Sequence, residues 1–392
     1  AIMLMVCTLT GASFAAEEES EEAKELSVVN SRVDELLEAV ADELPGADAV
    51  ETYVEQIYEE SPVQMQGNEN PLTGLDDLDP QAVGKRPVAV MINNHKDNYP
   101  QYNIGKADVI FEVVVEHDLT RFMALFADYQ NIPYLVSVRS YRYYFPAISE
   151  AFDAFYIHWG EDQTMMWYYE ELGLDSYDGL SNDYIFGRDQ ERMDNGYGAE
   201  HASCLYGDRL PLQIAEDGKR TDIDPEYAGP AFNFVPFGTV NVPDGNDCSF
   251  AYIDYRNQTT QLTYDPETGK YMKWALEEPQ IDGISGEQLS FENVLILYTD
   301  IQDRDEDEQE KAANRKWVQV LGQPTDAHTT GYYLSEGKAQ PIRWAKDDEW
   351  DNFRFYDLNG EEIMLNRGKT YITITYLDSA QLYDTIPQEY IR

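Results

Sequence analysis

Four arginines are the residues of this chain whose type and placement are best suited to chemistry. The chain carries 28 basic and 74 acidic residues, a formal net charge of −46, so each cation is conspicuous. Arg121, Arg139 and Arg142 lie close together, and the next Lys or Arg is Arg188. A guanidinium group presents a planar fork of N–H donors that matches a carboxylate or a phosphate. The sequence therefore predicts a shared anion pocket, the alternative being that each arginine pairs with its own surface carboxylate.

Short strands are predicted to position these arginines. Apolar, β-branched runs predict strands over residues 88–92, 108–116, 121–128, 134–138 and 154–159. Polar side chains stand at or near the ends of these runs. In open α/β sheets, strand ends on one edge converge and form the ligand crevice. The ligand-binding residues predicted for one cleft are therefore Asn93, Asn94, Arg121, Arg139, Ser140, Arg142, His158 and Arg188.

Two carboxylates are predicted to support the arginines. Glu112 and Glu116 are four residues apart on a predicted strand, so they would share one face. We expect them to hold the guanidinium groups in orientation. An acid/base pair or a cation site are the alternatives. The histidines show no helical metal-ligand spacing, and no nucleotide-binding or nucleophile-elbow motif occurs, so we predict no metal and no cofactor.

The N-terminal residues indicate export. Residues 1–15 form an apolar run ending in small residues, which predicts a cleaved signal peptide. Cys7 offers the alternative of a lipid anchor, although Val6 is bulky for such a signal. Residues 16–68 are acidic and predict a helical or flexible stalk. In an exported protein, Cys204 and Cys248 are candidates for a disulfide.

The rest of the chain predicts two domains. Over residues 69–228 predicted strands alternate with helical segments, which is typical of an α/β domain. Over residues 229–392 short strands are separated by turn pairs, which predicts a β-rich sandwich or open barrel. The fold class is therefore α+β overall. The strong negative charge excludes nucleic acid as a partner.

A series of motifs runs in order through both predicted domains: NPLTGL (70–75), RPVAVMINNH (86–95), ADVIFEVVVE (107–116), TRFMALF (120–126), VRSYRYYF (138–145), FGRD (186–189), YDPETGKYMKW (264–274), ENVLILY (292–298) and FYDLNGEEIMLNRGKTYITI (355–374). These motifs resemble those of the YerB-like lipoprotein family of bacterial extracytoplasmic proteins. Where similar proteins have glycines before the Thr-Arg-Phe motif, this chain has residues 116–119, and Tyr141 and Tyr143 replace Ala and Pro. The resemblance implies an α/β domain followed by a smaller β-rich domain outside the membrane.

Two classes of function follow from these expectations. The first is a non-enzymatic binding or scaffold module of the cell envelope, secreted or attached to the outer face of the cytoplasmic membrane. Its Arg-lined cleft would hold a phosphate, a carboxylate or an acidic wall polymer, and it could also dock another envelope protein. The second is an enzyme acting on a phosphorylated cell-wall precursor, which requires a metal-binding carboxylate or a poised base beside the arginines.

Overall fold

The computed structural model describes residues 67–165, 168, 172–306 and 308–390. These residues belong to one compact unit, Gln64–Arg392. The predicted signal peptide over residues 1–15 and nearly all of the predicted stalk over 16–68 lie outside the described residues. Within the described ranges, no helix combines the length and the apolar character needed to cross a membrane.

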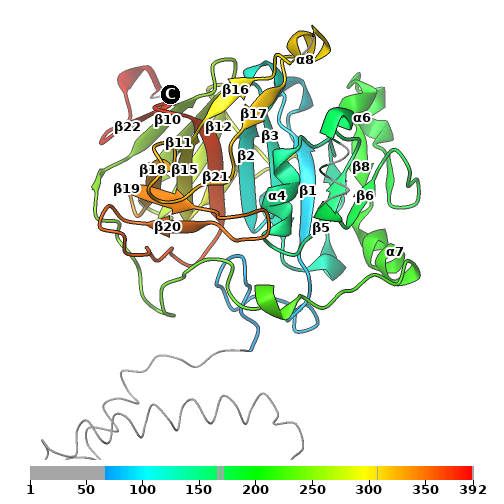
Figure 1. Ribbon diagram of the computed structural model, residues 1–392, viewed down its shortest axis with the longest axis horizontal. Coiled ribbons are helices and arrows are strands. Elements are labelled where there is room, and N and C mark those ends of the chain that lie inside the picture. Colours follow the sequence, from blue (N-terminus) through cyan, green and yellow to red (C-terminus); the bar gives the residue numbers. More distant parts are fainter. Residues whose placement is uncertain (1–66, 166–167, 169–171, 307, 391–392) are drawn as a thin grey trace, which may run out of the picture. The chain divides into compact units, whose positions relative to one another are not determined.

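A mixed eleven-stranded sheet forms the centre of the fold (Figure 1). A short strand, β9 (Asn246–Asp247), pairs with β19 at one side of the sheet. The other strands follow in the spatial order β20 (Arg354–Tyr356), β19 (Lys338–Ala345), β18 (Thr330–Ser335), β15 (Asn293–Thr299), β21 (Thr370–Tyr376), β2 (Val109–Val114), β3 (Thr120–Phe126), β1 (Val88–Asn93), β5 (Phe155–His158) and β6 (Ser176–Asp178).

The central strands confirm the strand predictions made for the first half of the chain. All residues of β1, β2 and β3 are buried. Such strands have no polar face, which explains their near-continuous apolar sequence. β3 runs antiparallel to both β1 and β2, while β1 is parallel to β5. The predicted α/β segment followed by a β-rich segment is also confirmed.

The two halves of the sequence share the large sheet. β21, from the far end of the chain, lies between β15 and β2 and is parallel to both. Thr370 is in register with Val109 on one side and Asn293 on the other. Strands coloured cyan and red in Figure 1 are therefore direct neighbours. The predicted boundary near residue 228 separates two sequence segments whose strands hydrogen-bond within a single sheet.

A second sheet covers one face of the large sheet. Val90 and Ile296 of the large sheet pack in one core with Ile253 and Leu262 of the second sheet. The second sheet follows the order β13 (Glu278–Pro279), β12 (Lys270–Ala275), β11 (Thr259–Asp265), β10 (Phe250–Asp254) and β22 (Ala380–Tyr383), and β14 (Ser290–Phe291) pairs with β12.

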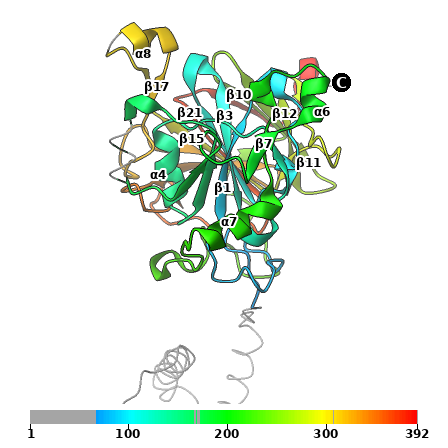
Figure 2. The same ribbon diagram turned by 90° about the vertical axis from the view of Figure 1, so that its right-hand side faces the viewer.

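Helix α4 (Tyr144–Glu150) packs on the opposite face of the large sheet. Its residues Phe145 and Ile148 belong to the core that contains Met91 and Phe111. Figure 2 shows α4 and the β10–β12 strands on opposite sides of the large sheet. The sheet thus separates two cores, and the face to which a strand residue points decides which core it enters.

Smaller elements complete the described fold. A three-stranded sheet carries Cys204 in β8, and Cys248 lies just before β10. Both cysteines are buried and free, so the predicted disulfide is wrong. Cys248 packs as a small apolar residue in the core between the large sheet and the second sheet. The smaller elements are β4 (Leu135–Val136), β7 (Phe186–Arg188), β8 (Ser203–Leu205), β16 (Ile301–Asp303), β17 (Lys316–Val318), α6 (Gln190–Asp194), α7 (Leu210–Glu216) and α8 (Glu308–Ala313).

Candidate functional site

A short segment inserted between two strands positions the central arginine. Direct pairing of β1 with β5 ends at Val90 and Ile157. Beyond that point the backbone N–H of Arg139 donates to the carbonyl of Met91 at 2.9 Å, and its carbonyl accepts from the N–H of Trp159 at 3.0 Å. Arg139 therefore occupies the place where the two strands diverge, at their carboxyl ends. Such a divergence point is where α/β sheets commonly bind ligands.

Glu116 pairs with two of the predicted arginines. Its carboxylate accepts from Nη2 of Arg121 at 3.1 Å and from Nε of Arg142 at 2.7 Å. The carbonyl of Ser140 accepts from Nη1 of Arg121 at 2.7 Å, and its Oγ accepts from Arg142 at 3.1 Å. Burial alone would raise the pKa of Glu116, but Arg121 and Arg142 together hold it well below its usual range. The predicted role of Glu116 in orienting the guanidinium groups agrees with these contacts.

Arg139 lacks such a partner. Among the described residues, no hydrogen bond or ion pair reaches its guanidinium group, and its Nε is buried without an acceptor. Burial lowers the pKa of Arg139, and the charges of Arg142 and Arg188 lower it further, while Glu116 and Glu200 act in the opposite direction. Nε of Arg121 is also buried without an acceptor. Positive charge therefore exceeds negative charge around Arg139. Two buried N–H donors, Nε of Arg121 and Nε of Arg139, have no acceptor among the described residues.

Arg188 borders this group from the three-stranded sheet. Its guanidinium lies over the ring of Trp159 at 4.0 Å and donates to the carbonyl of Ala199 at 2.8 Å. Both contacts leave the side chain exposed. Asn93, Glu116, Arg121, Arg139, Ser140, Arg142 and Arg188 together form what we call the arginine site.

Two residues beside the arginine site were missing from the predicted set. Nδ1 of His201 lies 3.1 Å from Nδ2 of Asn93, and burial lowers the pKa of His201, with Arg139 contributing. Arg192 is buried and donates to Oδ1 of Asn98 at 3.0 Å and to the carbonyl of His201 at 2.9 Å. Arg192 thereby ties the loop after β1 to the loop that carries His201. The sequence feature that could have indicated them is a rare Arg close to a rare His, Arg192 and His201, more than ninety residues beyond β1.

Glu112 and Asn94 do not belong to the arginine site. Glu112 is in register with Phe122 on β3, whereas Val113 is in register with Arg121. Neighbouring residues of a strand point to opposite faces, so Glu112 faces the second sheet while Arg121 faces the other side. Glu116 lies beyond the end of β2, in a 3-10 turn spanning Glu116–Asp118, so the expected four-residue strand periodicity does not apply to it. The prediction that Glu112 orients the arginines is therefore wrong.

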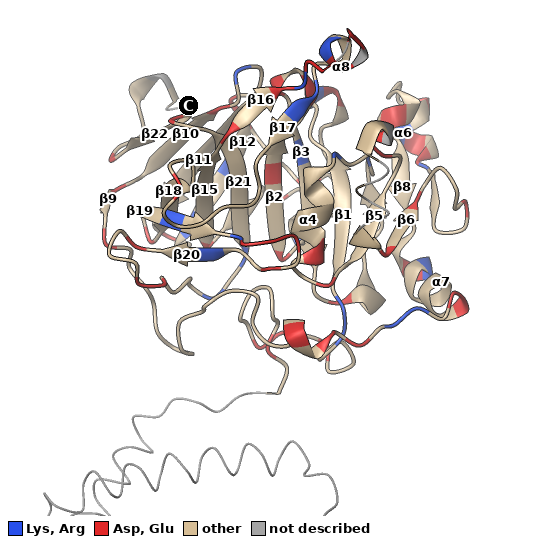
Figure 3. Cartoon of the chain, viewed as in Figure 1, with Lys and Arg blue, Asp and Glu red and all other residues tan. Residues whose placement is uncertain are grey.

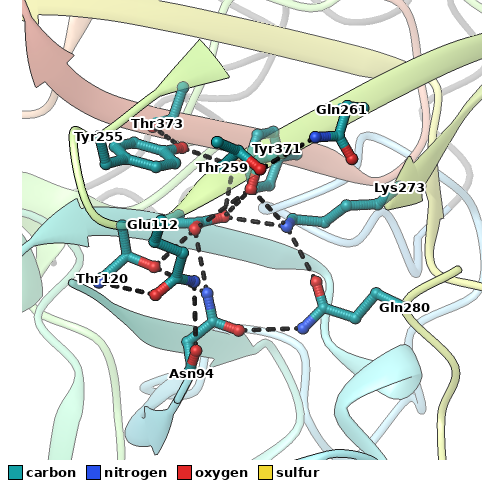
Figure 4. Close-up of polar contacts among 12 residues, drawn as sticks. Asn94, Glu112, Thr120, Tyr255, Thr259, Gln261, Lys273, Gln280, Tyr371 and Thr373 are labelled. Carbon is teal, nitrogen blue, oxygen red and sulfur yellow. Dashed lines mark hydrogen bonds and ion pairs between the residues drawn. The ribbon is translucent and has the colours of Figure 1, made fainter. Parts of the chain in front are cut away.

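Glu112 instead lies among several hydrogen-bond donors, one of which is a lysine (Figure 4). Its carboxylate lies 3.0 Å from Nζ of Lys273, and both side chains are fully buried. Burial lowers the pKa of Lys273 and the charge of Glu112 opposes that effect. Nζ of Lys273 also donates to Oγ1 of Thr260 and to Oε1 of Gln280. Further donors to the Glu112 carboxylate are Asn94, Thr120, Thr260 and Tyr371. We call these seven residues the Glu112 cluster.

His158 lies near the arginine site but is shielded from it. Its side chain is 1% exposed and its ring packs edge-on against Tyr141, with centroids 4.6 Å apart. Nδ1 lies 3.1 Å from the carbonyl of Gly160, and burial lowers the pKa of the imidazole to about 4, against an opposing effect of Asp178. No contact between His158 and the arginines occurs among the residues with described positions. Nε2 of His158 is buried without a hydrogen-bond partner among the described residues, so its predicted ligand role stays a prediction.

The arginine site is an electropositive spot in an acidic molecule. Figure 3 shows acidic residues distributed through the loops and short helices, whereas the central strands are mostly uncharged. Against a formal net charge of −46, two guanidinium groups paired with the half-buried carboxylate of Glu116, with Arg139 nearby, form a local exception. The general repulsion of anions by the molecule means that any anion bound here is selected by close contacts.

Comparison with known sequences defines the family. Residues 72–215 match the N-terminal domain of a family described as "Protein of unknown function (DUF3048)", and residues 251–372 match the C-terminal domain of the same family. The chain belongs to this two-domain family, which confirms the resemblance seen in the sequence motifs.

A relative in Bacillus subtilis (strain 168) is named "Putative lipoprotein YerB". It is 38% identical over 233 residues, which cover 58% of this chain and 66% of that protein. A crystal structure of the YerB protein from Bacillus subtilis has a TM-score of 0.67 and 24% identity, and the match covers 80% of this chain and 98% of that chain. The structural comparison shows the shared fold.

Proposed function

We propose that the protein is an extracytoplasmic binding module that holds an anionic group in the arginine site. The observation that carries this proposal is the unpaired guanidinium of Arg139, whose buried Nε has no acceptor within the described part of the chain. A buried donor without an acceptor costs free energy that a ligand oxygen would recover. The lipoprotein name of the Bacillus relative supports a location at the outer face of the cytoplasmic membrane.

The contacts favour an oxyanion that Arg139 can bind through two of its oxygens. Arg121 and Arg142 are already held by Glu116 and Ser140, so they supply a fixed positive field rather than free forks. Arg139 is the group left to make a bidentate contact, because two oxygens of a phosphate or a carboxylate match the planar fork of a guanidinium group. A phosphate group, a carboxylate of a peptide, or the repeating charge of an acidic wall polymer would each satisfy this requirement.

A thermal-shift experiment tests the proposal. Inorganic phosphate and pyrophosphate should raise the melting temperature of the wild-type protein, since a ligand that binds only the folded state stabilises it by about 2.7 kcal/mol at a hundredfold excess over Kd. Arg139→Ala should keep its unliganded melting temperature and lose the shift. Arg354→Ala is a matched control, because Arg354 is half exposed and pairs with Glu362 on the surface. Equal shifts in wild type and Arg139→Ala would overturn the proposal.

A further inference from the structure

Three potential metal ligands meet beside the arginine site. His95, Asp97 and His201 each offer one ligand atom, and the three atoms lie within 4.8 Å of one another. Nδ1 of His95 is 3.5 Å from Oδ2 of Asp97. The rings of His95 and His201 are nearly parallel, with centroids 6.0 Å apart and an interplanar angle of 18°. The two histidines are far apart in sequence, so the fold alone creates this group.

The surrounding contacts hold these side chains in place. Asn93 accepts from the backbone N–H of His95 at 3.1 Å and contacts Nδ1 of His201 with the other end of its amide. Arg192 donates to the carbonyls of Asn98 at 3.0 Å and His201 at 2.9 Å, which links the two loops. Supporting contacts of this kind orient metal ligands and strengthen binding in known metal sites.

We propose that His95, Asp97 and His201 bind one divalent transition-metal ion such as Zn²⁺. Two imidazoles and one carboxylate suit Zn²⁺ and related first-row ions, whereas Mg²⁺ and Ca²⁺ prefer oxygen ligands alone. The side chains of His95 and Asp97 are 33% and 62% exposed. Three protein ligands at an accessible position leave coordination open to another molecule, as in zinc sites that bind a substrate or water.

The ion would add to the positive field of the arginine site. Asn93 contacts His201 and is in register with Arg121 on the adjacent strand. Arg139 acts electrostatically on His201. An anion oxygen could therefore coordinate the ion while a second oxygen accepts from Arg139. This cooperation between ion and arginine rests on the anion-binding function proposed above, whereas the metal site stands on its own ligands.

Calorimetric titration with ZnCl₂ tests the metal site directly. Wild type should bind one equivalent of Zn²⁺, and His201→Gln and Asp97→Asn should each weaken that binding at least tenfold. Asp97 is largely exposed, so its amide variant should fold as wild type does. His117→Asn is the matched control, because His117 is an exposed histidine with a φ of 60° that Asn adopts readily. Absence of Zn²⁺ binding by wild type, or wild-type affinity in both ligand variants, would overturn the proposal.

A second titration separates the metal site from the anion site. Phosphate should bind the Zn²⁺-loaded wild type more tightly than the metal-free protein. Arg139→Ala should retain Zn²⁺ and lose phosphate. Zn²⁺ binding without any phosphate binding would leave the metal site standing and contradict the anion-binding function. Phosphate binding by a protein that takes up no Zn²⁺ would contradict the metal site and leave the anion-binding function standing.

Discussion

The Glu112 cluster and the arginine site use similar groups in opposite ways. Both centre on a carboxylate close to the same end of β2, one on each side of the large sheet. Glu112 faces one cation, Lys273, and neutral donors occupy its remaining positions. Glu116 faces Arg121 and Arg142, and Arg139 stands nearby without a partner of its own among the described residues.

In the Glu112 cluster the buried charges are matched within the fold, whereas in the arginine site one guanidinium group has no partner among the described residues. A fully buried ion pair is tolerated only when both charges are matched and their remaining hydrogen bonds are made. The Glu112 cluster meets that condition and joins β2 and β21 of the large sheet to β11 and β12 of the second sheet. The arginine site does not meet it, because Arg139 has no hydrogen-bond or ion-pair partner among the described residues, and this surplus positive charge is the basis of the proposed anion binding.

The largest expected effect comes from breaking the Glu112 cluster. Lys273→Met should destabilise the protein by about 3–5 kcal/mol, because it leaves the Glu112 carboxylate buried without a cation. Urea unfolding followed by circular dichroism would measure this change. Adding Glu112→Gln to the same chain should restore most of the loss, since the amide keeps several hydrogen bonds and carries no charge. Phosphate binding should be unchanged in the double variant, and a cost below about 1 kcal/mol for Lys273→Met would contradict the distinction.

A smaller effect is expected at the arginine site. Glu116→Gln should cost about 2 kcal/mol, since Arg121 and Arg142 lose their charged acceptor but keep their hydrogen bonds to Ser140. The same change should strengthen phosphate binding, because it removes the competing carboxylate. Unfolding measurements and phosphate titration on one preparation would report both results. Weaker phosphate binding in Glu116→Gln would show that the carboxylate positions the arginines for the ligand rather than competing with it.

The pH dependence of stability should also reveal Glu116. The arginines hold its folded-state pKa well below the ordinary value of 4.5, so its stabilising contribution is complete above pH 4.5 and is lost as the pH falls below that value. Wild type should therefore lose stability on acidification below pH 4.5 more steeply than Glu116→Gln, as measured by urea unfolding at several pH values.

The smallest predicted effect concerns His158, which is buried beside the arginine site. Its folded-state pKa of about 4 lies below the ordinary value of 6.5, so stability is lost as the pH falls from 6.5 towards 4. Between pH 7.5 and 5.5 this loss should be about 1 kcal/mol. His158→Gln should flatten the dependence over that interval, and an unchanged slope would show that His158 does not cause it.

The strands could be predicted from the sequence because burial on both faces leaves continuous apolar runs. The runs at β1, β2, β3 and β5 were all located within a few residues. Their order in the sheet could not be predicted, because nothing local tells β21 to insert between β15 and β2. Pairing between strands so far apart in the sequence depends on the whole core. The sequence pattern therefore predicts two separate domains, whereas strands from both segments form one continuous sheet.

The candidate site was predictable in part for a similar reason. Scarcity of positive charge located Arg121, Arg139 and Arg142, and strand-end geometry brought them together with Asn93. Glu112 and Glu116 do not share a face, because β2 ends at Val114 and Glu116 follows in a turn. Asn94 follows the end of β1, and its amide donates to Glu112. His201 and Asp97 were not assigned, since their meeting depends on loops tied together by Arg192.

Isothermal titration of pyrophosphate at low ionic strength tests the central claim most directly. Pyrophosphate should bind wild type at a single site, and Arg139→Ala should weaken that binding at least tenfold. Arg139→Lys should fail to restore it, because an ammonium group cannot reproduce the planar bidentate contact of a guanidinium. Arg354→Ala should bind as wild type does. Pyrophosphate binding of equal affinity in wild type and Arg139→Ala would contradict the claim that surplus charge at the arginine site serves a ligand.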